Sequence, residues 1–397
     1  MAAATILVTD GAHRAALAAV RSLGRAGYRV IVTDPTPRSL AGGSRWCDTE
    51  VVTPDPLADP AGFADRIAEV VARESAAVVL PITEPSVLAL LPARDRLAPA
   101  RIPLSSLDAF NRASDKALLM RLAPELGIAV PAQREIASAD ELAALDPESL
   151  SYPLVVKPAR SIGGDPASRS KQSVHRVASP SALRAHAATL PDSAYPLLLQ
   201  QRVVGPGIGI FLLLWEGRVV AQFAHRRIRE KPPAGGVSVY RESIPPAPEL
   251  VERSRRLLER CGLEGVAMVE YKVDQNTGTP FLMEINGRFW GSLQLAVDAG
   301  VDFPRLLVES ALGKHPAPVL RYRIGVRSRW WWGDLDHLLA RLRYSSAKLA
   351  LPPGAPSRWR VVLDFLKLWR PGDRNEVFRL SDPRPFWRES VAWIQRR

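Results

Sequence analysis

Short apolar runs alternate with segments of helical periodicity over the first 80 residues, and this alternation constrains the fold more than any other feature. After the first apolar run, Ala16, Ala19, Val20 and Leu23 recur at the spacing of one helical face. A second helix is expected over 60–73. The three apolar runs are Thr5–Val8, Arg29–Val32 and Ala76–Leu80. Such alternation predicts a parallel sheet with helices on both faces, in an α/β domain spanning 1–108.

The first strand-to-helix turn does not carry a dinucleotide-binding fingerprint. It reads Thr9-Asp-Gly-Ala-His-Arg14 and has one glycine where that fingerprint has three. Asp34 closes the second strand, where a ribose-binding acid would lie, but an aspartate there is more often a turn residue. An NAD(P)-dependent oxidoreductase is therefore the weakest of the three functions that we consider.

The pattern changes after about residue 105, and we expect a second, α+β domain over 109–318. Ser114 is the expected N-cap of a helix ending at Gly127, and Ser138 with Glu141 forms a capping box. Many strands and few helices follow, which suggests two lobes over 109–198 and 199–318. The expected strands are 152–157, 197–202, 209–215, 218–224, 266–273 and 280–284.

Lysine is rare in this chain, so its positions are informative. Only eight of the 53 basic residues are lysine. Lys157 follows an apolar strand, where a compact ammonium can neutralise phosphate; the alternative is a solvent-exposed residue at the strand end. Lys116 is less informative alone, because a lysine on the first turn of a helix is usually solvated.

A pair of glutamates and an asparagine form the strongest local signal. Glu284 lies on an apolar strand, with Asn286 two residues later on the same side. A turn over 274–278 joins this strand to the one that carries Glu270, so the two carboxylates are expected to face each other. Carboxylate and amide oxygens suit Mg²⁺. The alternative is a carboxylate buried against an arginine such as Arg288.

In this order and spacing, these motifs resemble the ATP-grasp superfamily over roughly residues 1–315. The similarity is greatest to the bacterial ATP-grasp carboxylate–amine ligase group, through Glu-Ile-Asn-Gly-Arg-Phe-Trp-Gly at 284–291 and the stretch at 225–236. The motifs that carry the resemblance are Lys116, Lys157, the polar loop 161–168, Gln200-Gln-Arg-Val203, and Glu270 with Glu284-Ile-Asn-Gly-Arg288. It implies a Rossmann-like (pre-ATP-grasp) N-terminal domain followed by an α+β ATP-grasp fold of two lobes.

The resemblance also implies roles for these residues. Lys116 and Lys157 would hold ATP phosphates, and the loop with Ser161, Gly163 and Gly164 would close over them. The hinge strand with Gln200, Gln201 and Val203 would meet the adenine through backbone groups. Glu270, Glu284 and Asn286 would bind one or two Mg²⁺ ions, with Mn²⁺ as an alternative, and Arg288 would stabilise the transferred phosphoryl group. His225, Arg227 and Arg241 flank the site, and the sequence does not choose which meets the γ-phosphate.

Three positions depart from the family pattern. Gly207 stands where the family often has an acid for the ATP ribose, and Gln201 replaces a glutamate in the hinge. Asp165-Pro166 makes the loop after Lys157 stiffer than a simple serine–glycine flap.

The implied function is ATP-dependent ligation of a carboxylate to an amine through an acyl phosphate, with amino acids or small peptides as the default substrates. A non-catalytic or regulatory nucleotide-binding protein is the first alternative, motivated by Gly207 and Gln201. The sequence names neither substrate and does not indicate an oligomeric state.

Residues 319–397 form a basic, tryptophan-rich extension. It holds seven of the ten tryptophans, and from Arg321 onward 17 Lys/Arg against 7 Asp/Glu, which is 17 − 7 = +10 of the net +12. Two amphipathic helices are expected, around 335–342 and 362–369. Peripheral attachment to an anionic membrane is one hypothesis. The alternative is that the tryptophans pack onto the main body. Binding of nucleic acid is the least supported hypothesis, because the extension has no recognised nucleic-acid-binding motif.

The remaining features point to a cytoplasmic protein. The longest apolar run, around Ile210–Trp215, is far shorter than the roughly 20 residues that cross a bilayer. The N-terminal residues lack the basic segment of a signal peptide. Two cysteines, Cys47 and Cys261, weakly favour a reducing compartment.

Overall fold

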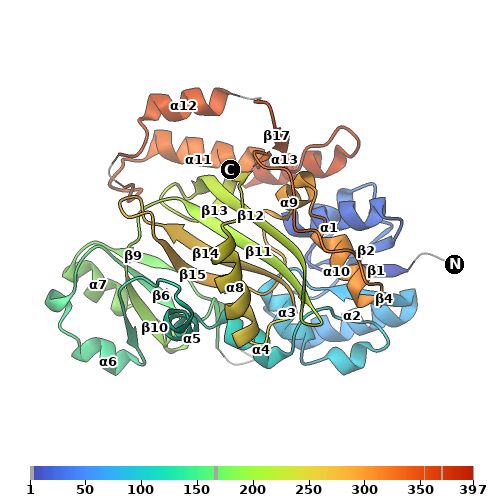
Figure 1. The fold of residues 1–397 in the computed structure, drawn as a ribbon, viewed down its shortest axis with the longest axis horizontal. Coiled ribbons are helices and arrows are strands. Elements are labelled where there is room, and N and C mark those ends of the chain that lie inside the picture. Colours follow the sequence, from blue (N-terminus) through green and yellow to red (C-terminus); the bar gives the residue numbers. More distant parts are fainter. Residues whose placement is uncertain (1–3, 165–168, 353, 368–369, 397) are drawn as a thin grey trace.

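The N-terminal domain contains the predicted parallel sheet. The structure is a computed structural model that describes residues 4–164, 169–352, 354–367 and 370–396 (Figure 1). The strand order is β3-β2-β1-β4 and all pairs are parallel. Its elements are β1 (Thr5–Val8), α1 (Arg14–Arg25), β2 (Arg29–Asp34), β3 (Thr49–Val52), α2 (Pro60–Glu74), β4 (Ala76–Leu80) and α3 (Glu84–Leu90). Helices α2 and α3 cover one face, and α1 covers the other.

Two short helices, α4 (Leu107–Ser114) and α5 (Lys116–Leu122), connect this domain to the next. The predicted cap is wrong by one residue, because Ser114 ends α4 and the Asp115 carboxylate caps α5 by accepting from the Leu118 N–H. A carboxylate beside helix N–H groups fulfils the same role as a hydroxyl. Lys116 is therefore the first residue of α5.

A small antiparallel sheet forms the first lobe, in the order β5-β10-β6-β9. One of its faces packs on α6 and α7 through Leu142 and Leu183. Leu198 points to the opposite face, toward α5 and the large sheet. The elements are β5 (Gln133–Ile136), α6 (Ala139–Ala144), β6 (Leu154–Pro158), β7 (Ile162–Gly163), β8 (Ser170–Lys171), β9 (His175–Val177), α7 (Pro180–Ala187) and β10 (Leu197–Gln201).

A seven-stranded sheet, β15-β14-β11-β12-β13-β16-β17, lies at the centre of the molecule. Strand β11 is apolar on both sides: Phe211 and Leu213 pack toward the N-terminal domain, and Ile210 and Leu212 pack toward α5 and α8. This explains its continuous apolar sequence. The elements are β11 (Gly207–Trp215), β12 (Arg218–Lys231), β13 (Val237–Ser243), α8 (Pro248–Arg260), β14 (Gly265–Val273), β15 (Pro280–Asn286), α9 (Leu293–Ala299) and α10 (Phe303–Ala311).

The C-terminal extension completes the large sheet and covers one side of the molecule (Figure 1). Its first strand pairs with β13, and the second pairs with the first in parallel. Its elements are β16 (Arg327–Arg329), α11 (Trp331–Arg343), α12 (Arg358–Leu366), β17 (Asp373–Asn375) and α13 (Arg384–Gln395). Trp369 of the second expected helix lies outside the described residues. No helix in the described ranges has the length and apolar character needed to cross a bilayer.

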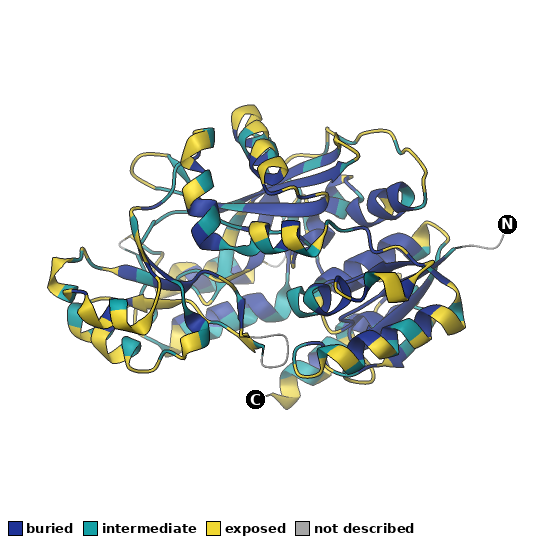
Figure 2. Ribbon diagram, turned by 90° about the horizontal axis from the view of Figure 1, so that it is seen from below, coloured by how far each residue is buried: buried dark blue, intermediate teal, exposed yellow. Residues whose placement is uncertain are grey.

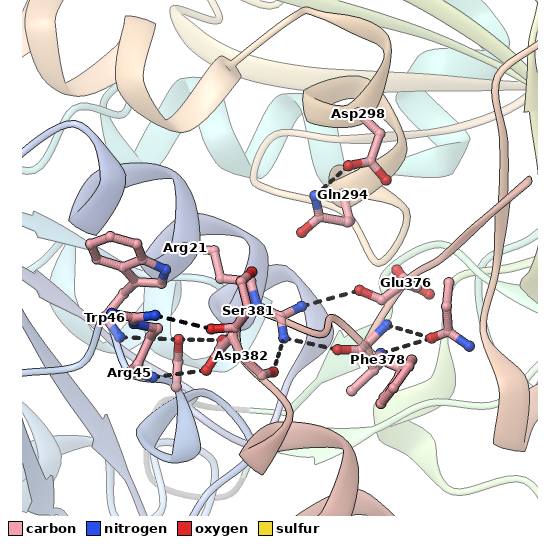
Figure 3. Close-up of polar contacts among 12 residues, drawn as sticks. Arg21, Arg45, Trp46, Gln294, Asp298, Glu376, Phe378, Ser381 and Asp382 are labelled. Carbon is pink, nitrogen blue, oxygen red and sulfur yellow. Dashed lines mark hydrogen bonds and ion pairs between the residues drawn. The ribbon is translucent and has the colours of Figure 1, made fainter. Parts of the chain in front are cut away.

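Buried ion pairs attach the extension to the N-terminal domain. The Arg21 guanidinium donates to the Asp382 carboxylate at 2.8 Å, and both side chains are 1% exposed (Figure 3). Arg14 forms an ion pair with Glu376 and stacks on Trp330 at 3.8 Å from the ring centroid. Burial elsewhere is concentrated in the strands and in the helix faces turned toward them (Figure 2). The extension is thus joined to the body by charge as well as by apolar contacts.

Candidate active site

Lys116 and Lys157 converge on Glu284 from different elements. Lys116, 4% exposed at the start of α5, donates to Ser161 Oγ at 2.9 Å and lies 3.8 Å from Glu284 Oε2. Lys157, 6% exposed on β6, donates to the Met283 carbonyl at 2.8 Å. The two residues are far apart in sequence, and the meeting of α5, β6 and β15 brings them together.

An irregularity in β15 makes the Met283 carbonyl available to Lys157. Glu270 pairs with Glu284 and Tyr271 pairs with Leu282, so Met283 is an extra residue in the strand. A bulge disrupts the ladder locally and leaves the extra residue unpaired. Lys157 supplies the hydrogen bond that the buried carbonyl requires.

Burial and neighbouring charges shift the ionisation of this cluster. Burial, opposed by the Glu284 carboxylate and aided by Lys116, lowers the pKa of Lys157 to about 8. Burial alone would raise the pKa of Glu284, but Lys116 and Lys157 hold it below its usual value. The site therefore combines an ionised carboxylate with a buried lysine, Lys157, whose charged form a nearby anion would favour.

Glu270, Glu284 and Asn286 form the predicted oxygen-rich set. The two glutamates are cross-strand partners, as the turn at 274–278 predicts. Asn286 donates to Glu284 Oε1 at 3.1 Å, and Arg288 donates to Asn286 Oδ1 at 3.0 Å. The Glu284 side chain is 30% exposed and that of Glu270 is 14% exposed. Two partly exposed carboxylates and an amide oxygen on adjacent strands fit the ligand preference of Mg²⁺.

Arg227 reaches Glu270 across two glycines of β11. It forms ion pairs with Glu270 and with Glu230, the latter at 2.9 Å. A Cβ atom at Gly207 would lie 2.9 Å from Arg227 Cδ, so a side chain there would displace the arginine. Gly209 lies between Glu270 and His225 in the register of the sheet. Gly207, the departure seen in the sequence, thus provides the space for this ion pair.

Comparisons with known proteins agree with this geometry. The family described as "ATP-grasp in the biosynthetic pathway with Ter operon" matches residues 193–331, which include the two glutamate strands. This segment of the chain therefore matches an ATP-grasp family.

Solved structures with the same fold cover most of the chain. The L-amino acid ligase from Bacillus licheniformis has a TM-score of 0.60 and 18% identity, over 79% of this chain and 75% of that chain. The N5-carboxyaminoimidazole synthetase from Staphylococcus aureus has a TM-score of 0.61 and 14% identity, over 82% and 80%. At these identities the likeness concerns the fold.

One sequence relative is the carbamoyl phosphate synthase large chain from Rubrobacter xylanophilus. It is 28% identical over 152 residues, which are 37% of this chain. The match spans only 14% of that relative's length, so the similarity concerns a segment of a much larger protein.

Three basic residues flank this cluster, and the structure distinguishes them. Arg241 is fully buried; it donates to the Ser238 carbonyl at 2.8 Å and forms an ion pair with Glu376 of the extension. His225 is 1% exposed, with its ring edge-on to Phe211. Burial lowers its pKa well below the ordinary value, so it is neutral. Arg227 is the one of the three that contacts a predicted metal ligand.

The loop after Lys157 is partly described. Ile162–Gly163 pairs with Ser170–Lys171, and Gly164 has a φ of +91°. A Cβ at Gly163 would lie 2.3 Å from the Ser193 carbonyl oxygen, so this position requires glycine. Asp165-Pro166 lies outside the described residues.

The expected adenine-binding strand is β10. Gln200, 3% exposed, donates to Gln133 Oε1 at 2.6 Å, while Gln201 is exposed. The backbone N–H of Gln201 donates to the Ala132 carbonyl at 2.8 Å and is therefore not free to meet a base. Val203 follows β10 and is half-buried.

The N-terminal domain contributes two residues that sequence reasoning missed. Glu84 begins α3. Burial raises the pKa of its carboxyl group, and the positive charges of Arg288 and Lys116 oppose that rise. His13 is the N-cap of α1, and burial lowers its pKa, with Arg288 again among the charges that act on it. Both follow strands of the parallel sheet, at whose carboxyl edge ligand-binding residues gather. That position is the signal that could have identified them.

Proposed function

We propose that this chain is an ATP-dependent ligase that joins a carboxylate to an amine and releases ADP and phosphate. The observation that carries the proposal is the convergence of Lys116, Lys157 and Arg288 on the Glu284–Asn286 strand. Proteins with the same fold support it, because they include an L-amino acid ligase and biotin carboxylases in complex with β,γ-ATP or with MgADP.

The lysines would neutralise the phosphates during transfer. Phosphoryl transfer needs mainly positioning and charge neutralisation, not a protein nucleophile. Lys116 and Lys157 would bind phosphate oxygens from α5 and β6, while the loop with Ser161, Gly163 and Gly164 excludes water. Glu270, Glu284 and Asn286 would hold Mg²⁺, or Mn²⁺ with similar ligand preferences, and this ion would neutralise charge on the phosphates.

Arg288 and Arg227 would act at the acyl centre and the transferred group. A carboxylate is a poor electrophile, so its oxygen first takes the γ-phosphoryl group, and the amine then displaces phosphate from the acyl phosphate. Arg288 would stabilise the oxyanion formed in that attack. Of the three basic candidates, we assign Arg227 to the γ-phosphate, because it contacts the proposed metal ligand Glu270, whereas Arg241 pairs with Glu376 and His225 packs on Phe211.

The substrates would bind between the N-terminal domain and the large sheet. Across this interface, the positive charge of Arg288 opposes the rise that burial causes in the pKa of Glu84 and adds to the fall that burial causes in the pKa of His13. A carboxylate beside an arginine suits a substrate that carries both an amine and a carboxylate. We therefore propose amino acids or small peptides as substrates, and a cytoplasmic location where ATP is available.

A non-catalytic nucleotide-binding protein is the alternative function. It is favoured by the Arg227–Glu270 ion pair, which already neutralises one expected metal ligand. The bonded N–H of Gln201 also removes one group for adenine recognition. The ion pair would permit binding of a nucleotide with little turnover, whereas the bonded N–H would weaken adenine recognition in either protein.

A screen of carboxylate and amine pairs, scored by ADP release, tests the proposal. We expect ADP release that requires both substrates, ATP and Mg²⁺, and a condensed product detected by mass spectrometry. A parallel calorimetric titration with MgATP separates the alternatives. Nucleotide binding with no substrate-dependent turnover across amino acids and peptides would favour the non-catalytic protein, and absence of nucleotide binding would contradict both.

A further inference from the structure

Helix α12 presents two apolar faces, and the described residues cover only one of them. Val361 and Phe365 are buried against α11, where the rings of Phe365 and Trp331 are tilted to each other with centroids 5.4 Å apart. On another side of the helix, Trp359, Leu363 and Leu366 are 79%, 59% and 60% exposed. Their spacing of four and three residues places them on one face of the helix. We call Trp359, Leu363 and Leu366 the outer face of α12.

Basic residues surround the outer face. Residues 341–370 contain seven Lys/Arg and one Asp, a balance of 7 − 1 = +6. The side chains of Arg360 and Lys367 are 72% and 55% exposed, and helical geometry places them beside the outer face. Asp364 is the only acid of the segment and is contacted by both. An exposed apolar stripe bordered by cations is the pattern of a helix that lies in a membrane interface.

The helix is mounted rigidly on the large sheet. Asp334 of α11 accepts from Arg229 and from Arg329, each at 2.6 Å. The Arg329 guanidinium also donates to the Phe365 carbonyl of α12 at 2.9 Å. This network joins α12 to β12, the strand that carries Arg227. A face held in place loses little conformational freedom on binding a surface.

We propose that the outer face of α12 binds peripherally to an anionic lipid surface. The apolar side chains would enter the boundary between headgroups and acyl chains, and the cations would lie among anionic headgroups. A second copy of the chain would bring another +6 segment against this one, which charge repulsion opposes. Nucleic acid would match the cations but would leave the apolar stripe in water. The attachment surface is therefore one helix face and not the whole extension.

Helix α13 provides a matched control. Trp387, Val391 and Ile394 are 63%, 53% and 62% exposed and have the same spacing as the outer face of α12. Residues 371–396, however, contain five Lys/Arg and four Asp/Glu, a balance of 5 − 4 = +1. The two helices therefore expose similar apolar faces and differ in the surrounding charge.

Co-sedimentation of the full chain with vesicles tests the proposal. The vesicles are phosphatidylcholine alone, or phosphatidylcholine with phosphatidylserine. We expect the protein to sediment with the anionic vesicles at low salt, to be released by added salt, and to stay in solution with the neutral ones. Two triple variants to serine are compared, W359S/L363S/L366S on α12 and W387S/V391S/I394S on α13.

The α12 triple variant should lower the partition coefficient of the protein onto anionic vesicles by about tenfold or more. The α13 triple variant should leave that coefficient nearly unchanged. Arg360→Gln with Lys367→Gln should lower it by about fivefold per charge removed and reduce the salt dependence. This pair keeps the test decisive even if the α12 triple fails to fold. Equal loss in both triples, equal binding to neutral vesicles, or no sedimentation at low salt would overturn the proposal. So would a dimer that the α12 triple dissociates.

Discussion

Glu284 is the residue at which the separate parts of the candidate site meet. It lies 3.8 Å from Lys116, accepts from Asn286, and pairs with Glu270 across the hairpin. If it binds the metal, Glu284→Gln should lower kcat by about a hundredfold or more, because several kcal/mol of charge stabilisation are lost. Steady-state ADP release checks this.

Glu249→Gln is the control for that substitution, because its side chain on α8 is 85% exposed. The thermal transition should be nearly unchanged in Glu249→Gln and lower in Glu284→Gln, because the two lysines that hold the pKa of Glu284 below its usual value lose an opposite charge. Near-normal Mg²⁺-dependent activity in Glu284→Gln would show that the metal lies elsewhere.

Lys157 combines a structural bond with the proposed phosphate contact. Lys157→Ala should raise the KM for ATP and lower kcat. Lys157→Arg should restore activity only in part, because a planar guanidinium does not reproduce a compact ammonium. Titration with ATP and turnover measurements on both variants check this. Unchanged ATP binding and turnover in Lys157→Ala would leave the residue only its bond to the Met283 carbonyl.

At the scale of elements, β11 determines where Arg227 can reach. Gly207→Val places a side chain where Arg227 Cδ now lies, so the arginine should lose its ion pair with Glu270. We expect kcat/KM to fall by about tenfold or more, because the Arg227 guanidinium moves away from its proposed position beside the γ-phosphate. The neighbouring Ile208→Val is the control, because it shortens a half-buried side chain on the other face of the strand. Equal values of kcat/KM in Gly207→Val and Ile208→Val would contradict the assigned role of Arg227.

Helix α13 carries a half-buried acid, Glu389, that should make stability depend on pH. Burial raises the pKa of Glu389 to about 7, against an ordinary 4.5. Between these values the folded chain binds more protons than the unfolded chain, so the free energy of unfolding decreases as pH rises through this window. Glu389→Gln should remove that decrease and can still accept the Trp330 Nε1–H bond, now 2.8 Å.

Urea unfolding of the wild type and Glu389→Gln at pH 5 and pH 8 measures this effect. The variant should gain stability relative to the wild type at the higher pH. An identical difference between the two proteins at both pH values would mean that Glu389 ionises normally in the folded chain.

At the scale of the whole molecule, the extension fastens the two ends of the chain together. Asp382→Ala leaves Arg21, 1% exposed, without its carboxylate partner. Breaking a buried pair from one side costs about 3–5 kcal/mol. The free energy of unfolding, measured in urea, should fall by that order.

Glu69→Ala, which removes an exposed pair with Arg66, should change the free energy of unfolding by about 1 kcal/mol or less. Equal losses in Asp382→Ala and Glu69→Ala would show that the extension adds little to the stability of the body. A chain that ends before residue 319 should aggregate, because it uncovers Arg14, Arg241 and the apolar surface beneath α11.

Local patterns in the sequence determined the elements and the kind of chemistry. Alternating apolar runs predicted the parallel strands of the first domain, and the turn at 274–278 predicted the pairing of Glu270 with Glu284. These features depend on residues close together in the chain, whose spacing fixes which side chains share a face. The motif resemblance supplied the ATP-grasp fold, which the comparisons support.

Only the tertiary structure decided how distant residues meet. Gly207 reads as a missing acid in the sequence, but in the sheet it lies with Gly209 on the path by which Arg227 reaches Glu270. Trp330 of the extension packs against the core of the body, and the outer face of α12 stays exposed. Neither outcome follows from spacing along the chain, because both depend on which elements become neighbours when separate layers pack. Burial and charge pairing across those layers then decide which side chains remain available for function.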